Sequence, residues 1–63
     1  MTKIEVVWKG LQILSKYSDN IRNEHFYLIA GPEFNKKVST EDYLALLAMG
    51  WSNNEGVGFE ISL

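Results

Sequence analysis

The chain has 63 residues, of which 46% are hydrophobic and 22% charged, and its net charge is -2. It is about half the size of a typical domain, so we expect residues 1–63 to form a single compact domain with one core. The composition excludes a disordered, highly charged chain. The small negative charge argues against a nucleic-acid binder that depends on neutralising phosphates.

The sequence contains no cysteine, which rules out disulfides, thiolate nucleophiles and sulfur metal sites. No apolar run approaches the roughly 18 residues of a membrane span, and residues 1–5 lack the charged-then-apolar pattern of a signal peptide. We therefore expect a cytoplasmic protein without a membrane partner.

The first predicted element is a helix over residues 3–17. Thr2 and Glu5 have the spacing of a capping box, in which each side chain accepts a hydrogen bond from the other residue's backbone N–H. A set of apolar residues follows at helical spacing, and this set is the predicted core face: Ile4, Val7, Trp8, Leu11 and Leu14. The polar run 18–20 should end the helix, with a loop through Arg22 and Asn23 after it.

Residues 25–30 are apolar and aromatic and are followed by Gly31-Pro32, a pattern that predicts a short strand. Alternation places Phe26, Leu28 and Ala30 on one face of this strand. A polar loop over residues 33–37 should follow.

The second predicted helix covers residues 40–49. Ser39 can cap its first turn, with Asp42 at the reciprocal position of a capping box. Gly50 supplies the left-handed residue that commonly ends a helix, and Trp51 can then fold back onto Leu46.

Residues 57–63 alternate apolar and polar side chains, which predicts a strand with one buried face. The stretch 52–56 has turn composition, and Trp51-Ser52 can begin the partner strand of a hairpin. The element order is helix, strand, helix, strand, strand. The expected fold is α+β, with two helices on one face of a small, mainly antiparallel, three-stranded sheet.

Both helices carry more apolar surface than one sheet can cover. The apolar arc of residues 3–17 spans about 220°, whereas packing on a sheet requires little more than about 100°. In the second helix, Leu46 and Met49 lie on the side of Asp42, away from the face of Leu44, Leu47 and Ala48. The surplus residues are our candidates for contacts with a protein partner or a second copy: Val6, Ile13, Tyr17, Leu46 and Met49.

The sequence contains no strong motif for a catalytic, metal-binding or ligand-binding site. His25, the one histidine, follows Glu24, but adjacent strand residues point to opposite faces, so the two are poorly placed to share a proton. No carboxylates have the spacing of a metal site, and no serine has a nucleophile context. We predict no catalytic residue, metal or cofactor, and retain His25, Tyr27 and Glu24 as candidate ligand residues.

Five short segments resemble a group of small proteins without assigned function that are encoded by bacterial genomes, phages and plasmids. The segments are Gly10 to Tyr17, Glu24-His25, Ala30-Gly31-Pro32, Val38 to Asp42, and Leu47 to Trp51. The resemblance implies a compact α+β domain, and an origin in mobile elements would suit an inhibitor or regulatory role.

Two functional hypotheses follow. The first is a non-enzymatic protein-interaction module, most simply a homodimer. The alternative is a small ligand-binding or catalytic protein with a site around His25 between subunits.

Overall fold

The computed structural model describes residues 1–33, 38–54 and 57–63. These residues form two helices and four strands, in the order helix, strand, strand, helix, strand, strand. They are α1 (Lys3–Leu14), β1 (Ile21–Glu24), β2 (Tyr27–Ala30), α2 (Thr40–Ala48), β3 (Ser52–Asn54) and β4 (Gly58–Ser62). The predicted loop 33–37 lies outside the described residues except for Glu33, as does the end of the predicted turn 52–56.

The strands form one antiparallel sheet in the order β1-β2-β4-β3. The α+β class is therefore confirmed, whereas the three-stranded sheet and the predicted element order are wrong. The missing strand is β1, where we expected a loop through Arg22 and Asn23. Its sequence, Ile-Arg-Asn-Glu, has one apolar residue and so no alternation of apolar and polar side chains, and pairing with β2 defines the strand.

The strand predicted to begin at His25 begins at Tyr27. His25 has a φ of +56°, and with Phe26 it forms the two-residue turn between β1 and β2. Left-handed backbone interrupts the alternation of faces that an extended strand would impose.

The predicted helix signals at the ends of α1 and α2 are largely present. Thr2 Oγ1 accepts from the Glu5 N–H at 3.1 Å, and Glu5 Oε1 accepts from the Thr2 N–H at 3.0 Å. The Trp51 N–H donates to the Leu46 carbonyl at 3.0 Å across Gly50, whose φ is +98°. This is the glycine-dependent helix end that the sequence predicts. Helix α1 ends at Leu14, earlier than expected, and residues 15–17 form a turn.

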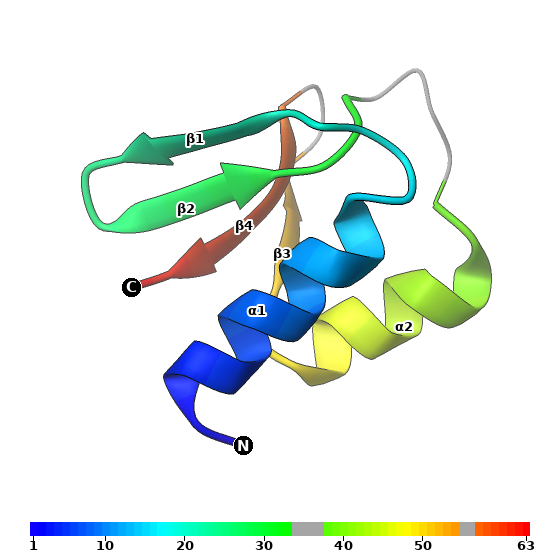
Figure 1. Cartoon of the computed structure of the whole chain (residues 1–63), viewed down its shortest axis with the longest axis horizontal. Helices are drawn as coiled ribbons and strands as arrows, with labels where there is room; N and C mark the ends of the chain where they lie inside the picture. Colours follow the sequence, from blue (N-terminus) through cyan, green and yellow to red (C-terminus); the bar gives the residue numbers. More distant parts are fainter. Residues whose placement is uncertain (34–37, 55–56) are drawn as a thin grey trace.

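The core lies between the helices and one face of the sheet, and both helices cover that face (Figure 1). Its buried members are Leu14, Ala30, Leu46, Trp51, Phe59 and Ile61. The last two come from β4 and lie opposite Ala30 and Leu28 of β2, so the predicted alternation is confirmed for these four residues. It is wrong for Phe26, which lies in the turn before β2 and is 78% exposed, and for Leu63, which follows β4 and is 58% exposed. In the described residues, neither helix combines the length and hydropathy that a membrane span requires.

The core face predicted for α1 is wrong in part, because the helix is rotated toward Trp51. A Cβ added at Gly10 would lie 2.2 Å from Trp51 Nε1, so the indole rests directly on the helix backbone. Trp51 Nε1 also donates to the Val6 carbonyl at 2.9 Å. Gly10 therefore faces the core, while Trp8 is 57% exposed and Ile4 is 81% exposed.

The two sides of α2 are likewise reversed. Leu46 is 0% exposed and belongs to the core, whereas Leu44 is 58% exposed and Leu47 is 41% exposed. The cap at Gly50 turns Trp51 toward Leu46 and so determines which side of α2 is buried.

Candidate interaction surfaces

Apolar side chains gather at the surface on one side of α1. Ile4, Trp8 and the C-terminal Leu63 are each more than half exposed. They surround a groove of about 350 Å³ in which Lys3 is the one charged lining residue. We define the apolar lining residues as the α1 flank: Ile4, Val7, Trp8, Leu11 and Leu63. An exposed apolar group of this kind is typical of a surface that binds another protein.

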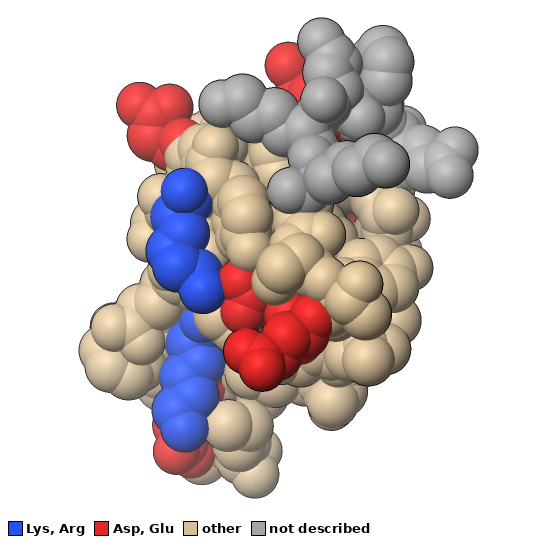
Figure 2. Space-filling view, turned by 90° about the vertical axis from the view of Figure 1, so that its right-hand side faces the viewer, with Lys and Arg blue, Asp and Glu red and all other residues tan. Residues whose placement is uncertain are grey.

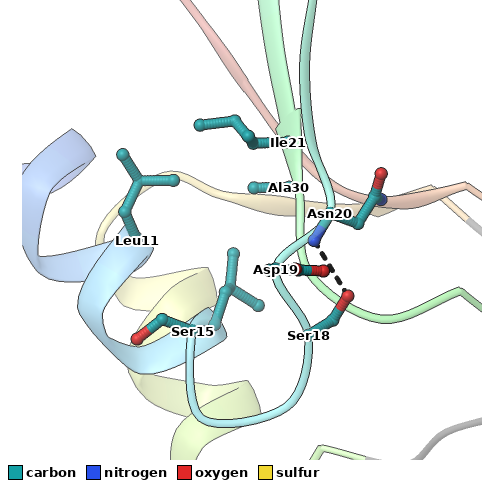
Figure 3. Close-up of a pocket in the computed structure, with 8 residues that line it drawn as sticks. Leu11, Ser15, Ser18, Asp19, Asn20, Ile21 and Ala30 are labelled. Atoms are coloured by element: carbon teal, nitrogen blue, oxygen red, sulfur yellow. Dashed lines mark hydrogen bonds between the residues drawn. The ribbon is translucent and has the colours of Figure 1, made fainter.

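The α1 flank continues toward β1 through a second hollow of about 190 Å³ (Figure 3). Leu11 lines both hollows, and in the second it lies opposite Ile21 and Ala30. Ile21 lies on the same face of the sheet as its partner Ala30, which the helices cover, and it is nevertheless 54% exposed. The apolar surface therefore extends from the C-terminus to the outer strand of the sheet.

Of the predicted contact residues, Leu46 is a core residue and presents no surface to a second molecule, so its assignment is corrected. Val6, Ile13 and Met49 are partly buried against the core. Ile13 and Met49 also line an open groove between α1 and α2.

Tyr17, the fifth predicted contact residue, joins the turn after α1 to the start of α2. Its hydroxyl donates to Asp42 Oδ2 at 2.5 Å and accepts from the Ser39 N–H at 3.2 Å. Lys16 Nζ lies 2.8 Å from the same Asp42 oxygen, and Ser39 Oγ accepts from the Asp42 N–H at 3.2 Å. In a capping box, the Asp42 side chain would accept a hydrogen bond from the Ser39 N–H. Here the Tyr17 hydroxyl accepts that hydrogen bond instead.

The charge on Asp42 is stabilised by these contacts. The hydrogen bond from Lys16, followed by that from Tyr17, lowers the pKa of the Asp42 carboxyl, and the same pairing raises the pKa of Lys16. This arrangement connects two helices and has the character of a structural support.

The three candidate ligand residues lie together, contrary to the expectation that Glu24 and His25 face apart. Glu24, His25 and Tyr27 line one hollow of about 320 Å³ on the outer face of the sheet. The left-handed backbone at His25 explains the difference. The other lining residues are Ile29, Asn54 and Glu60, and Asn54 Nδ2 donates to Glu60 Oε1 at 2.7 Å.

Charged side chains form no one-sided basic surface on the face seen in Figure 2, where a narrow basic band lies beside acidic groups. Among residues 1–33, 38–54 and 57–63, no three His, Asp or Glu side chains are grouped so that they could hold a metal ion.

In comparisons with protein-family models, with curated proteins and with solved structures, nothing matches this chain.

Sequence reasoning missed three structural residues. Gly10 in the middle of a helix is a signal of close packing, because glycine costs about 1 kcal/mol there relative to alanine. Asn20 binds the Gly31 carbonyl through Nδ2 at 3.0 Å and accepts from the Gly31 N–H at 3.0 Å, so it aligns β1 with β2. The contact of Tyr17 with Asp42 joins segments that are distant in the sequence, so no local sequence pattern predicts it.

Proposed function

We propose that this chain is a non-enzymatic protein-association module that forms a homodimer. The observation that carries the proposal is the α1 flank, where Trp8 is 57% exposed at the edge of a groove with apolar walls. Tryptophan is enriched among the residues that dominate binding energy at protein interfaces.

A second copy is the simplest occupant of this surface. Soluble oligomers are mostly symmetric homodimers, in which one patch meets the same patch on its partner. The α1 flank is apolar on both copies and needs no complementary sequence elsewhere. If the protein is cytoplasmic and encoded by a mobile element, an inhibitor or regulatory role would use the surface of such a dimer.

The test is the solution mass by light scattering over a wide dilution range, for the wild type, Trp8→Glu and Leu44→Glu. We expect a dimer for the wild type and a Kd at least about tenfold higher for Trp8→Glu, because a carboxylate would be buried at the interface. Leu44→Glu is the matched control, since Leu44 is 58% exposed on the other helix and should leave the Kd unchanged.

A wild-type monomer across the whole range would contradict homodimer formation. Equal weakening by the two substitutions would contradict the assignment of the interface to the α1 flank. Circular dichroism of each variant establishes that the fold is retained.

The hollow lined by Glu24, His25 and Tyr27 favours a second candidate function, the binding of a small ligand on the outer face of the sheet. Its two carboxylates, from Glu24 and Glu60, would suit a cationic group. Addition of a simple diamine or of a metabolite set should then shift the His25 and Tyr27 NMR resonances. Unchanged resonances would remove this candidate.

A further inference from the structure

We infer that β1 is the pairing strand of the dimer: it binds β1 of a second copy in antiparallel orientation, with the two-fold axis at Asn23. This inference rests on the proposed homodimer and specifies how it is built. Two four-stranded sheets would then become one continuous sheet of about eight strands, a form of strand addition at a sheet edge.

Strand β1 lies at the edge of the sheet (Figure 1) and has one strand neighbour, β2, in the described structure. Glu24 and Tyr27 flank the two-residue turn, and the Gly31 N–H donates to the Asn20 carbonyl at 3.0 Å. In an antiparallel ladder these bonded pairs alternate, so Asn20, Arg22 and Glu24 direct their backbone groups toward β2. Ile21 and Asn23 therefore direct theirs toward the free edge.

An exposed edge of this kind is a template for another strand unless it is blocked. Proteins block such edges with short strands, charged side chains, proline or a covering element. The segment Ile21–Glu24 is short but has no proline, and its two charged side chains, Arg22 and Glu24, have opposite signs, so a second copy of the strand can pair with them.

Charge selects the register. Arg22 and Glu24 lie on the same face of β1, with Nε and Oε2 3.3 Å apart, and both side chains are about half exposed (50% and 51%). In a two-fold antiparallel pair, the residue at the axis lies opposite its own copy. The backbone groups of Ile21 and Asn23 must face those of the second strand, so the axis can lie at Ile21, Arg22, Asn23 or Glu24. Centring on Arg22 or Glu24 places like charges opposite each other, and centring on Ile21 places Arg22 opposite Asn20.

Centring on Asn23 alone places Arg22 opposite Glu24 of the second copy, and symmetry repeats the pair. These are positions without backbone hydrogen bonds between the two β1 strands, where Cα atoms approach to about 4.5 Å and side chains interact most closely. The edge strand is thus complementary to itself in one register.

The same pairing covers the apolar surface described above. Ile21 lies on the helix-covered face of the sheet and lines a hollow with Leu11. Joining the two β1 strands would bring the α1 flanks of both copies toward each other over the central strands. One interface would then account for the edge strand and for the exposed apolar residues of the α1 flank.

A charge-reversal series tests the register. Arg22→Glu and Glu24→Arg should each raise the Kd of the dimer about tenfold, because two attractive pairs become repulsive. The double variant Arg22→Glu/Glu24→Arg should return the Kd to within about twofold of the wild type. No recovery in the double variant would overturn the register centred on Asn23.

Amide hydrogen exchange tests the edge itself. The Asn23 amide, which faces Asn23 of the second copy in this register, should gain protection as the concentration rises, whereas the Arg22 and Glu24 amides are protected by β2 at every concentration. A dimer in which the Asn23 amide exchanges as fast as in the monomer would overturn the β1 pairing and leave the proposed homodimer intact. A wild type that stays monomeric would contradict both.

Discussion

The two tryptophans lie on different sides of α1 and have opposite environments. Trp51 is 1% exposed, packs on the backbone at Gly10 and donates its indole N–H to the Val6 carbonyl. Trp8 is 57% exposed on the α1 flank. The orientation of α1 is therefore determined by where the Trp51 side chain can approach the α1 backbone, at Gly10, and not by where apolar residues are most numerous on the helix.

Polar contacts also differ between the Trp51 side and the Trp8 side of α1. The buried side of α1 continues into the turn where Tyr17 and Lys16 hold Asp42 at the start of α2. Beside the α1 flank, β1 pairs with β2 and has no other strand neighbour among the described residues. Side-chain contacts within the chain thus join the segments on the first side of the molecule, while the second side exposes apolar side chains next to an edge strand.

The largest effect should come from Trp51→Ala. Removing a fully buried tryptophan costs about 3–5 kcal/mol, which approaches the entire free energy of unfolding of a domain this small. We expect a chain that is largely unfolded at 37 °C by circular dichroism. A cooperative transition close to that of the wild type would contradict the central place of Trp51 in the core.

Gly10→Ala should have the next largest effect. Its Cβ would lie 2.2 Å from Trp51 Nε1 and 2.3 Å from Cε2, so the indole or the helix must move. Overpacking costs about 1–3 kcal/mol, which exceeds the roughly 1 kcal/mol that alanine gains in a helix. Urea unfolding should show destabilisation, whereas the exposed control Gln12→Ala should change the free energy of unfolding by less than about 0.5 kcal/mol.

Asp42→Asn should produce a smaller, pH-dependent effect. The pKa of Asp42 is lowered in the folded state from its ordinary value of 3.8 by Lys16 and then Tyr17. The stabilisation is fully present above that value and is lost as the pH falls through the folded pKa. Melting temperatures should therefore differ between wild type and variant at pH 6 and converge toward pH 2, and a constant difference would contradict the ionic contribution.

Local signals predicted where both helices begin and where α2 ends. The capping box of Thr2 and Glu5, the cap at Ser39 and the glycine at position 50 each act within a few residues, so the sequence is sufficient to find them. The alternation that places Phe59 and Ile61 in the core is equally local.

The features that escaped prediction depend on distant partners. Strand β1 has no pattern of its own and exists because the turn at His25 returns the chain to pair with it. The rotation of α1 is determined by Trp51, about 40 residues away. That rotation packs Val6 and Ile13 partly against the core and leaves Ile4 and Trp8 exposed, and it follows from packing rather than from helical periodicity.

The smallest effect on folding should come from Trp8→Ala. Because Trp8 is mostly exposed in the monomer, its loss should change the free energy of unfolding by about 0.5 kcal/mol or less at high dilution. Dimer formation stabilises the folded state by mass action, so the melting temperature of the wild type should rise with protein concentration. In Trp8→Ala this rise should be reduced, since the substitution removes an interface anchor and leaves the core intact. Equal concentration dependence in the two proteins would show that Trp8 lies outside the interface, and a large loss of stability at high dilution would show that it supports the fold of the single chain.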